Sequence, residues 1–266
     1  MADGLRMRIA VHNLTDTQLA GFREAYRQMQ AISDNRGYQY LAGIHGAPGY
    51  YCWHHQHNDA RSAAQMQLFP PWHRAYLYTW EMWMRDRVPD VTLPWWDWTL
   101  QNAQQRGVPT AFAQSNVNGQ PNPLARFRMN MPTTNPPLMR NTARQPGSPN
   151  DLPTQDDVDD LLSRTDWNDF ADALEDIHDN IHGWVGGDMG VVGTAAFDPI
   201  FWSHHAMIDR LWAIWQVRNG NSNISPELLD VVLSPFNFRV RDVLNVNDLG
   251  YDYAAAQGIV PVGGTG

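Results

Sequence analysis

The sequence has very little cysteine, because Cys52 is the only one among 266 residues. A single cysteine cannot form a disulfide within the chain, so a cross-linked scaffold is excluded. Packing or a bound metal must therefore supply the stability that disulfides give to many small domains. The hydrophobic content of 43% is enough for a buried core, and the length predicts one domain over residues 1–266.

The sequence also lacks long apolar runs and an excess of positive charge. No stretch of about 18 apolar residues occurs, and the beginning, MADGLRMRIAVHNLTD, has no apolar core, so we expect neither a membrane span nor a signal peptide. The 19 basic and 28 acidic residues leave a net charge of −9. This charge gives no electrostatic reason to bind nucleic acid or an anionic membrane. We expect a soluble chain without nucleic-acid or membrane partners, and its compartment stays undecided.

Hydrophobic periodicity predicts a mainly α fold with few strands. Thr15 and Gln18 have the spacing of a capping box, which predicts a first helix over 16–32. Other stretches carry apolar residues at helical spacing between capping and stop residues. They predict helices over 36–45, 72–87, 166–182 and 198–218, and Gly183 lies just past the end of the helix over 166–182. Residues 103–154 hold half of the 18 prolines and are predicted to form a long irregular loop.

Most of the ten histidines crowd into two windows of the sequence. In the second window, His178 and His182 are four residues apart on a predicted helix, so their side chains lie on one face and can share a metal. His204 and His205 follow one helix later. Either of them lies on an apolar stripe, so spacing alone leaves open which one points inward.

The first window surrounds a loop. His45 ends one predicted helix, His73 begins another, and the segment CWHHQH at 52–57 lies between them. A lone histidine is more often a packed or surface residue, but this clustering favours a ligand set. Imidazole-rich sites suit copper, zinc, nickel or iron. A zinc hydrolase usually needs only three protein ligands and a water, so half of these histidines would already be enough for it. The 12 tryptophans have a simpler interpretation, which is core packing.

Three segments in order resemble the copper signatures of the tyrosinases, catechol oxidases and molluscan hemocyanins. FPPWHRAYLYTWE at 69–81 resembles the first signature, HDNIHGWVGGDM at 178–189 the intervening element, and DPIFWSHHAMID at 198–209 the second signature. TLPWWDW at 92–98 is also similar to the family, and the resemblance extends over about 36–218. It implies a four-helix bundle with long irregular loops around two copper ions, each held by three histidines, with O2 as the co-substrate.

The resemblance also implies which histidines hold each copper. By position, the first copper takes His45 and His73, and the second takes His178, His182 and His205.

The sixth ligand departs from the usual pattern of the family. Its usual place, four to five residues before the first signature, is occupied here by alanines at 63–64. In fungal and molluscan members a Cys-x-His supplies this ligand through a thioether, and Cys52 with His54 matches that pattern. We therefore assign His54 as the sixth ligand, with His57 as the next candidate and His55 as the third.

Two further residues have expected roles around the metals. A metal-bound histidine usually gives its second N–H to a carboxylate or a carbonyl, and Asp209, four residues after His205, is placed for this. An ion pair of Asp209 with Arg210 or Arg74 is the alternative. Val192 falls where members of the family often carry a residue that shapes the entrance above the metals.

One departure from the family concerns the hydroxylation of monophenols. Asp179 follows His178, where most relatives have Asn. In the family, that Asn and an upstream Glu are thought to hold a water that deprotonates the incoming monophenol. The carboxylate of Asp179 can accept a hydrogen bond from that water, and Asp169 or Glu175 can take the part of the Glu.

The expected function is that of a tyrosinase, which oxidises small phenols and catechols to o-quinones that lead to products such as melanin. A catechol oxidase without hydroxylation, a hemocyanin-like dioxygen carrier and a remnant that lost its first copper are the alternatives. A carrier usually works in large arrays, whereas this chain shows no repeated unit. The sequence does not identify the natural phenol. It also leaves open whether the protein forms a homo-oligomer or needs a copper-delivery partner.

Overall fold

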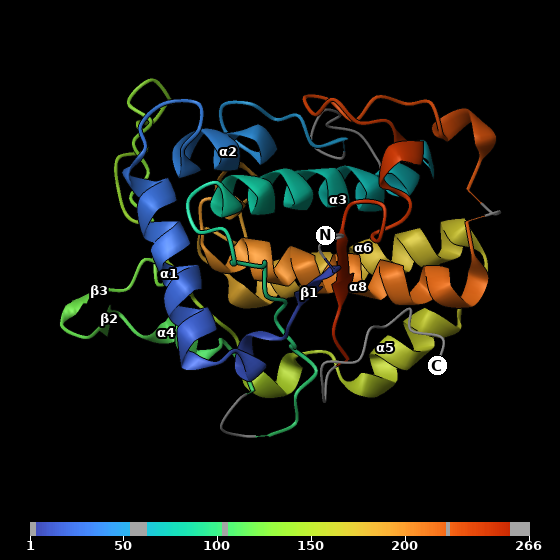
Figure 1. Cartoon of the computed structure of the whole chain (residues 1–266), viewed down its shortest axis with the longest axis horizontal. Coiled ribbons are helices and arrows are strands. Elements are labelled where there is room, and N and C mark those ends of the chain that lie inside the picture. The colour runs from blue at the N-terminus through green and yellow to red at the C-terminus, as the bar shows by residue number, and fades with distance from the viewer. Residues whose placement is uncertain (1–3, 54–62, 103–105, 222–223, 256–266) are drawn as a thin grey trace.

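The computed structural model describes residues 4–53, 63–102, 106–221 and 224–255. It is rich in helix, as predicted (Figure 1). The α-helices are α1 (Asp16–Ala31), α2 (Tyr38–His45), α3 (Ala63–Arg85), α4 (Thr110–Ala113), α5 (Gln155–Ser163), α6 (Trp167–Val185), α7 (Val192–Ala195) and α8 (Ile200–Asn219). Among the described residues, none of these helices combines the length and the apolar character needed to cross a membrane.

Short 3-10 helices and strands complete the described structure. The 3-10 helices are η1 (Val11–Asn13), η3 (Pro149–Asp151), η4 (Pro226–Leu228) and η5 (Val240–Val243). The strands are β1 (Arg6–Arg8), β2 (Asn116–Val117), β3 (Gln120–Pro121) and β4 (Tyr251–Tyr253). β2 and β3 form a small hairpin, whereas β1 and β4 pair in parallel from opposite ends of the chain.

Three long helices form the centre of the molecule. α3 packs against α6 and α8, and the three run side by side along the long axis in Figure 1. α2 packs against α1 and α7. Nine of the 12 tryptophans are fully buried, and Trp80 of α3 stacks on Trp202 of α8 with ring centroids 4.0 Å apart. The interpretation of most tryptophans as core residues is therefore confirmed.

The capping signals identified α1 correctly and also explain a helix that was not predicted. Thr15 Oγ1 accepts from the backbone N–H of Gln18, whose side chain accepts from the N–H of Thr15. α5 has the same reciprocal arrangement between Thr154 and Asp157. The third residue of α5 is Asp157, where Glu or Gln is the usual signal of a capping box, so this helix was not predicted.

The predicted starts of two helices were wrong. α2 begins at Tyr38, two residues later than predicted, and α3 begins at Ala63 instead of at residue 72. Prolines usually end a helix because they lack the N–H, and Pro70 and Pro71 therefore suggested a boundary. Every residue from 68 to 77 is buried, so the burial of apolar surface outweighs the lost hydrogen bonds. His73 thus lies within a helix and not at its start.

The predicted end of α6 was also wrong. The helix continues past Gly183 to Val185, and Gly186 forms its C-terminal cap with a positive φ of 62°. Glycine reaches this left-handed conformation without the steric cost that other residues meet. Burial of Val185 stabilises the additional residues of the helix, which explains why Gly183 does not end it.

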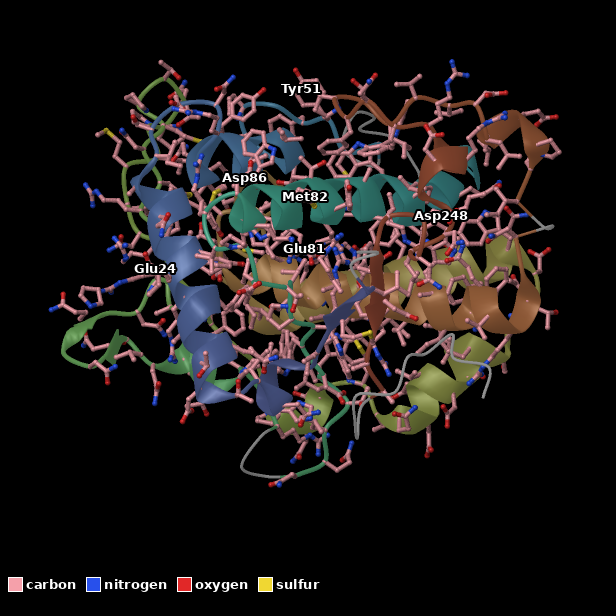
Figure 2. All side chains as sticks on the ribbon, viewed as in Figure 1. Glu24, Tyr51, Glu81, Met82, Asp86 and Asp248 are labelled. Atoms are coloured by element: carbon pink, nitrogen blue, oxygen red, sulfur yellow. The ribbon has the colours of Figure 1, made fainter. Side chains whose placement is uncertain are left out.

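A buried charge cluster links the ends of the described chain to the central helices. Arg8 of β1 is fully buried, and its Nε donates to Glu81 Oε2 at 2.6 Å. Glu81 lies on the side of α3 that faces β1 (Figure 2). The hydroxyls of Tyr251 and Tyr253 on β4 donate to Asp209 Oδ2 of α8 at 2.8 and 2.6 Å.

Arg74 completes this cluster from α3. Its Nε donates to Asp209 Oδ1 at 2.6 Å, and its guanidinium lies 3.6 Å from the ring centroid of Trp212. Burial raises the pKa of the Asp209 carboxyl, but the charges of Arg74 and Arg8 outweigh it, so the pKa lies below its ordinary value. Asp209 was expected either to orient a ligand histidine or to form an ion pair. The structure shows the ion pair with Arg74.

We expect Asp209→Asn to lower the free energy of unfolding by about 3–5 kcal/mol, because it leaves two buried guanidiniums without their shared partner. Urea denaturation followed by tryptophan fluorescence measures this loss. Asp230→Asn is the control, since Asp230 pairs with Arg239 and Arg241 while all three side chains are more than half exposed. That change should cost less than about 1 kcal/mol.

The stability difference between wild type and Asp209→Asn should depend on pH. The folded-state pKa of Asp209 is depressed, so its contribution is present above the ordinary carboxyl pKa of about 4 and disappears as the pH falls below it. The difference between wild type and Asp209→Asn should therefore shrink in acid. Equal stabilities of the two proteins at pH 7 would contradict the assignment.

Candidate metal centre

Four helices bring five of the predicted ligand histidines together. His45 is the last residue of α2, His73 lies in α3, His178 and His182 lie one turn apart on α6, and His205 lies in α8. The packing of α3 against both α6 and α8 therefore decides how the imidazoles meet.

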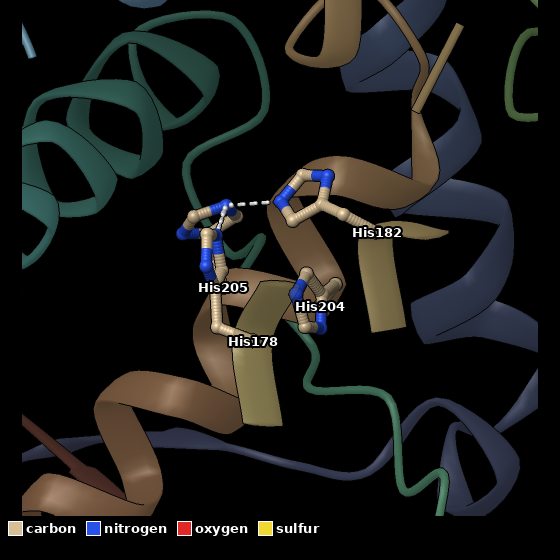
Figure 3. A group of neighbouring side chains, drawn as sticks. All are labelled: His178, His182, His204 and His205. Carbon is tan, nitrogen blue, oxygen red and sulfur yellow. Dashed lines mark hydrogen bonds between the residues drawn. The ribbon is translucent and has the colours of Figure 1, made fainter. Parts of the chain in front are cut away.

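The imidazoles of α6 and α8 converge on one point, as Figure 3 shows. His205 Nε2 lies 3.2 Å from His178 Nε2 and 3.1 Å from His182 Nε2. On the outer side, His178 Nδ1 lies 2.9 Å from Asp179 Oδ1, and His182 Nδ1 lies 2.7 Å from the carbonyl of Met189. Acceptors at the outer nitrogens leave the inner nitrogens free of protons, which is the arrangement that metal-binding histidines use. The donor set therefore fits a metal ion.

His204 belongs to the same group, which spacing alone did not predict. Its ring is fully buried and lies 5.3 Å from the ring of His178, nearly parallel to it. Within the described part of the chain, neither ring nitrogen of His204 has a hydrogen-bond partner. Potential ligand atoms of His178, His182, His204 and His205 all lie within 4.8 Å of one another. Figure 3 shows His204 beside the three nitrogens that converge.

A second group lies on the other side of His205. Ligand atoms of His45, Cys52 and His73 lie within 4.8 Å of one another, and Cys52 Sγ is 3.7 Å from His73 Nε2. The thiol is fully buried, and His73 Nδ1 lies 2.9 Å from the carbonyl of Phe69. This group offers two imidazoles among the described residues. The candidates His54, His55 and His57 lie outside them.

The two groups form one centre. The rings of His73 and His205 stack with centroids 4.4 Å apart, and the ring of His45 lies 6.1 Å from that of His205. Apolar rings surround them, because Phe201 lies 4.0 Å from His205 and Phe69 lies 4.7 Å from His178 between ring centroids. The centre can therefore hold two metal ions side by side in a largely apolar shell.

Burial keeps the imidazoles of His182, His204 and His205 neutral. It lowers the pKa of His182 to about 4, although the hydrogen bond to the Met189 carbonyl offsets part of the effect. Burial also lowers the pKa of His204 and His205 well below the ordinary value, and the neighbouring imidazoles add to this. The neutral ring is the form that binds a metal, so no deprotonation is needed at neutral pH.

A cavity of about 410 Å³ opens above the centre. Its lining includes three of the imidazoles, two carboxyls and one exposed apolar side chain: His45, His178, His182, Glu175, Asp179 and Val192. A larger groove of about 800 Å³ between α5 and α6 contains none of the clustered histidines, so it is not the metal centre.

The structure separates the two candidates for the family's upstream Glu. Glu175 is buried and lines the cavity one turn before Asp179. Asp169 is exposed in the first turn of α6, nine residues or about 13 Å along the helix axis from His178. Of these two carboxyls, only Glu175 is therefore placed to act at the centre.

A family model and individual known proteins that resemble this chain agree on its family. Residues 35–218 match the family model described as the common central domain of tyrosinase. Unit G of the hemocyanin beta-C chain of Helix pomatia is 30% identical over 94% of this chain and 66% of its own length. The tyrosinase of Streptomyces lincolnensis is 30% identical over 61% of this chain and 67% of its own length.

Solved structures show the same fold. A functional unit of octopus hemocyanin superposes with a TM-score of 0.77 at 25% identity, covering 96% of this chain and 71% of that one. The tyrosinase of Burkholderia thailandensis gives a TM-score of 0.79 at 23% identity, covering 96% and 74%. The chain spans less than two thirds of the length of the hemocyanins that it matches, with 66% of the Helix unit and 21% of an Enteroctopus dofleini polypeptide.

Proposed function

Because this chain belongs to the tyrosinase family, we propose that it is a copper-dependent phenol oxidase. It would use O2 to hydroxylate monophenols and to oxidise o-diphenols to o-quinones. The observation that carries the proposal is the histidine centre at the base of a cavity of about 410 Å³. This space accommodates a single aromatic ring with a short substituent.

Access to the centre favours an oxidase over a dioxygen carrier, the other activity found among the relatives. A carrier must keep phenols away from its metals. Here the cavity is lined directly by His178 and His182, while Val192 at its edge is 47% exposed and the Asp179 side chain is 55% exposed. The described residues thus leave the imidazoles within reach of a small substrate.

The imidazoles divide into two ligand sets for copper. We propose His178, His182 and His205 for the second ion, and His45 and His73 together with His54 for the first. When bound, the two copper ions supply dioxygen binding and the two-electron oxidation of the phenol ring. Imidazole ligands suit copper, and the buried rings of Phe69 and Phe201 keep water from the metals.

Asp179 and Glu175 are proposed to remove the proton of a monophenol. A phenol with a pKa of about 10 is scarcely ionised at neutral pH, so a positioned base increases the reactive fraction. Asp179 accepts from His178 Nδ1, and Glu175 lies on the same cavity wall. A water held between these carboxylates can accept the phenol proton.

We expect two copper ions per chain, and loss of one of them together with the activity in His54→Ala. Copper content by mass spectrometry and oxidation of 4-ethylcatechol measure these effects. His12→Ala is the control, because His12 belongs to neither histidine group. If His54→Ala kept both ions and full activity, the ligand assignment would be wrong, and His57 would be the next residue to test.

We also expect a thioether between Cys52 and His54 in the copper-loaded protein. The buried Cys52 Sγ lies within the first ligand group, where a free thiol would face an oxidising centre. The intact mass should be lower by two hydrogens, and Cys52 should resist alkylation after denaturation. Cys52→Ser should show no such mass loss, and a free thiol in the loaded wild type rules out the link.

Asp179→Ala should lower monophenol turnover relative to diphenol turnover by about 10-fold or more, because it removes a partner of the base. The neutral pair 4-ethylphenol and 4-ethylcatechol is suitable, since the charge of Asp179 does not act on it. Asp176→Ala on the other face of α6 is the control. An unchanged ratio would contradict the role of Asp179, and wild type without monophenol turnover would indicate a catechol oxidase.

A further inference from the structure

We infer that the cavity selects phenols that carry an ammonium group and that Asp179 is the residue that determines this specificity. The inference rests on the proposed phenol oxidase function and names its substrate class. Among the described residues that line the cavity, Glu175 and Asp179 are acidic, and none is an arginine. The wall therefore places carboxyl groups beside the imidazoles.

Asp179 stands where the cavity meets solvent. Its Oδ1 lies 2.9 Å from His178 Nδ1, which fixes the carboxylate beside a ligand imidazole, and its side chain is 55% exposed. A phenol whose hydroxyl faces the imidazoles directs its ring substituent away from them, toward this mouth. A charged group on that substituent therefore meets Asp179 before it reaches bulk water.

Another part of the cavity lining is apolar. Val192 lines the cavity, and the Tyr50 hydroxyl lies near the next residue, because a Cβ placed on Gly193 would be 2.8 Å from it. Val192 and Tyr50 are 47% and 43% exposed. This part of the lining suits the short apolar linker of a phenylethyl side chain and supplies no charge of its own.

Arg140, which is not among the residues that line the cavity, has a carboxylate partner of its own. Its two terminal nitrogens each donate a hydrogen bond to Asp188 at 2.7 Å. Bound copper adds positive charge at the centre, but this charge is the same in every variant compared. The change in preference caused by Asp179→Asn thus isolates the carboxylate.

The test uses copper-loaded protein and three o-diphenols that share a two-carbon side chain and differ in its terminal group. Dopamine carries an ammonium, 4-ethylcatechol is neutral, and 3-(3,4-dihydroxyphenyl)propionate carries a carboxylate. O-diphenols are chosen because their oxidation does not require the hydroxylation step. We expect kcat/KM for dopamine to exceed that for the propionate about 10-fold in wild type.

Asp179→Asn should reduce this ratio to about 2-fold or less, mainly through KM, because the attraction acts on binding. Raising the salt from about 0.05 M to about 0.5 M should weaken the wild-type preference and leave the variant unchanged. Asp176→Asn is the matched control. It removes the same charge from the same helix, but Asp176 lines the groove between α5 and α6, so the ratio should stay at the wild-type value.

Anaerobic calorimetry with the same three compounds gives a readout that does not depend on turnover. Equal kcat/KM values for dopamine and the propionate in wild type, or a preference that survives Asp179→Asn, would overturn the inference. Binding that follows the charge series in a protein that oxidises none of the compounds supports the specificity and overturns only the proposed oxidase function.

Discussion

The ion pair between Arg74 and Asp209 is the interaction on which the metal centre depends. Both side chains are buried, so neither charge can be satisfied by water and each must face the other. Arg74 directly follows His73 in α3, and Asp209 lies one turn after His205 in α8. The pair therefore sets the spacing and rotation of the two helices from which these histidines project, and their rings stack at 4.4 Å.

This constraint extends beyond the segment that matches the family model. Arg8 and Tyr253, from β1 and β4, both bind Asp209, and they bind each other at 2.7 Å. Residues more than 240 positions apart thus complete the hydrogen bonds of one carboxylate. Because an incompletely satisfied buried charge is costly, the parallel pairing of β1 with β4 stabilises the helix packing that holds the histidines.

The sequence was informative where the signal is local and less so where it depends on packing. The capping box at Thr15 identified α1, and the clustering of histidines in the sequence indicated both groups of potential ligands. The start of α3 could not be placed, since Pro70 and Pro71 oppose a helix locally and only burial against other helices favours it. His204 was left open because two adjacent residues on a buried helix both face apolar neighbours. The pairing of β1 with β4 leaves no periodic signal in strands of three residues each.

Burial divides the centre into two chemical environments. In the interior, the cost of desolvation keeps the imidazoles of His182 and His205 neutral, so a metal does not have to displace protons. At the mouth, Asp179 is solvated and accepts from the outer nitrogen of His178. One carboxylate can thus orient a ligand ring, increase its basicity and present charge to an arriving molecule. An amide at this position could still accept from the ring but would present no charge, so the aspartate adds an electrostatic selectivity that ligand orientation alone does not require.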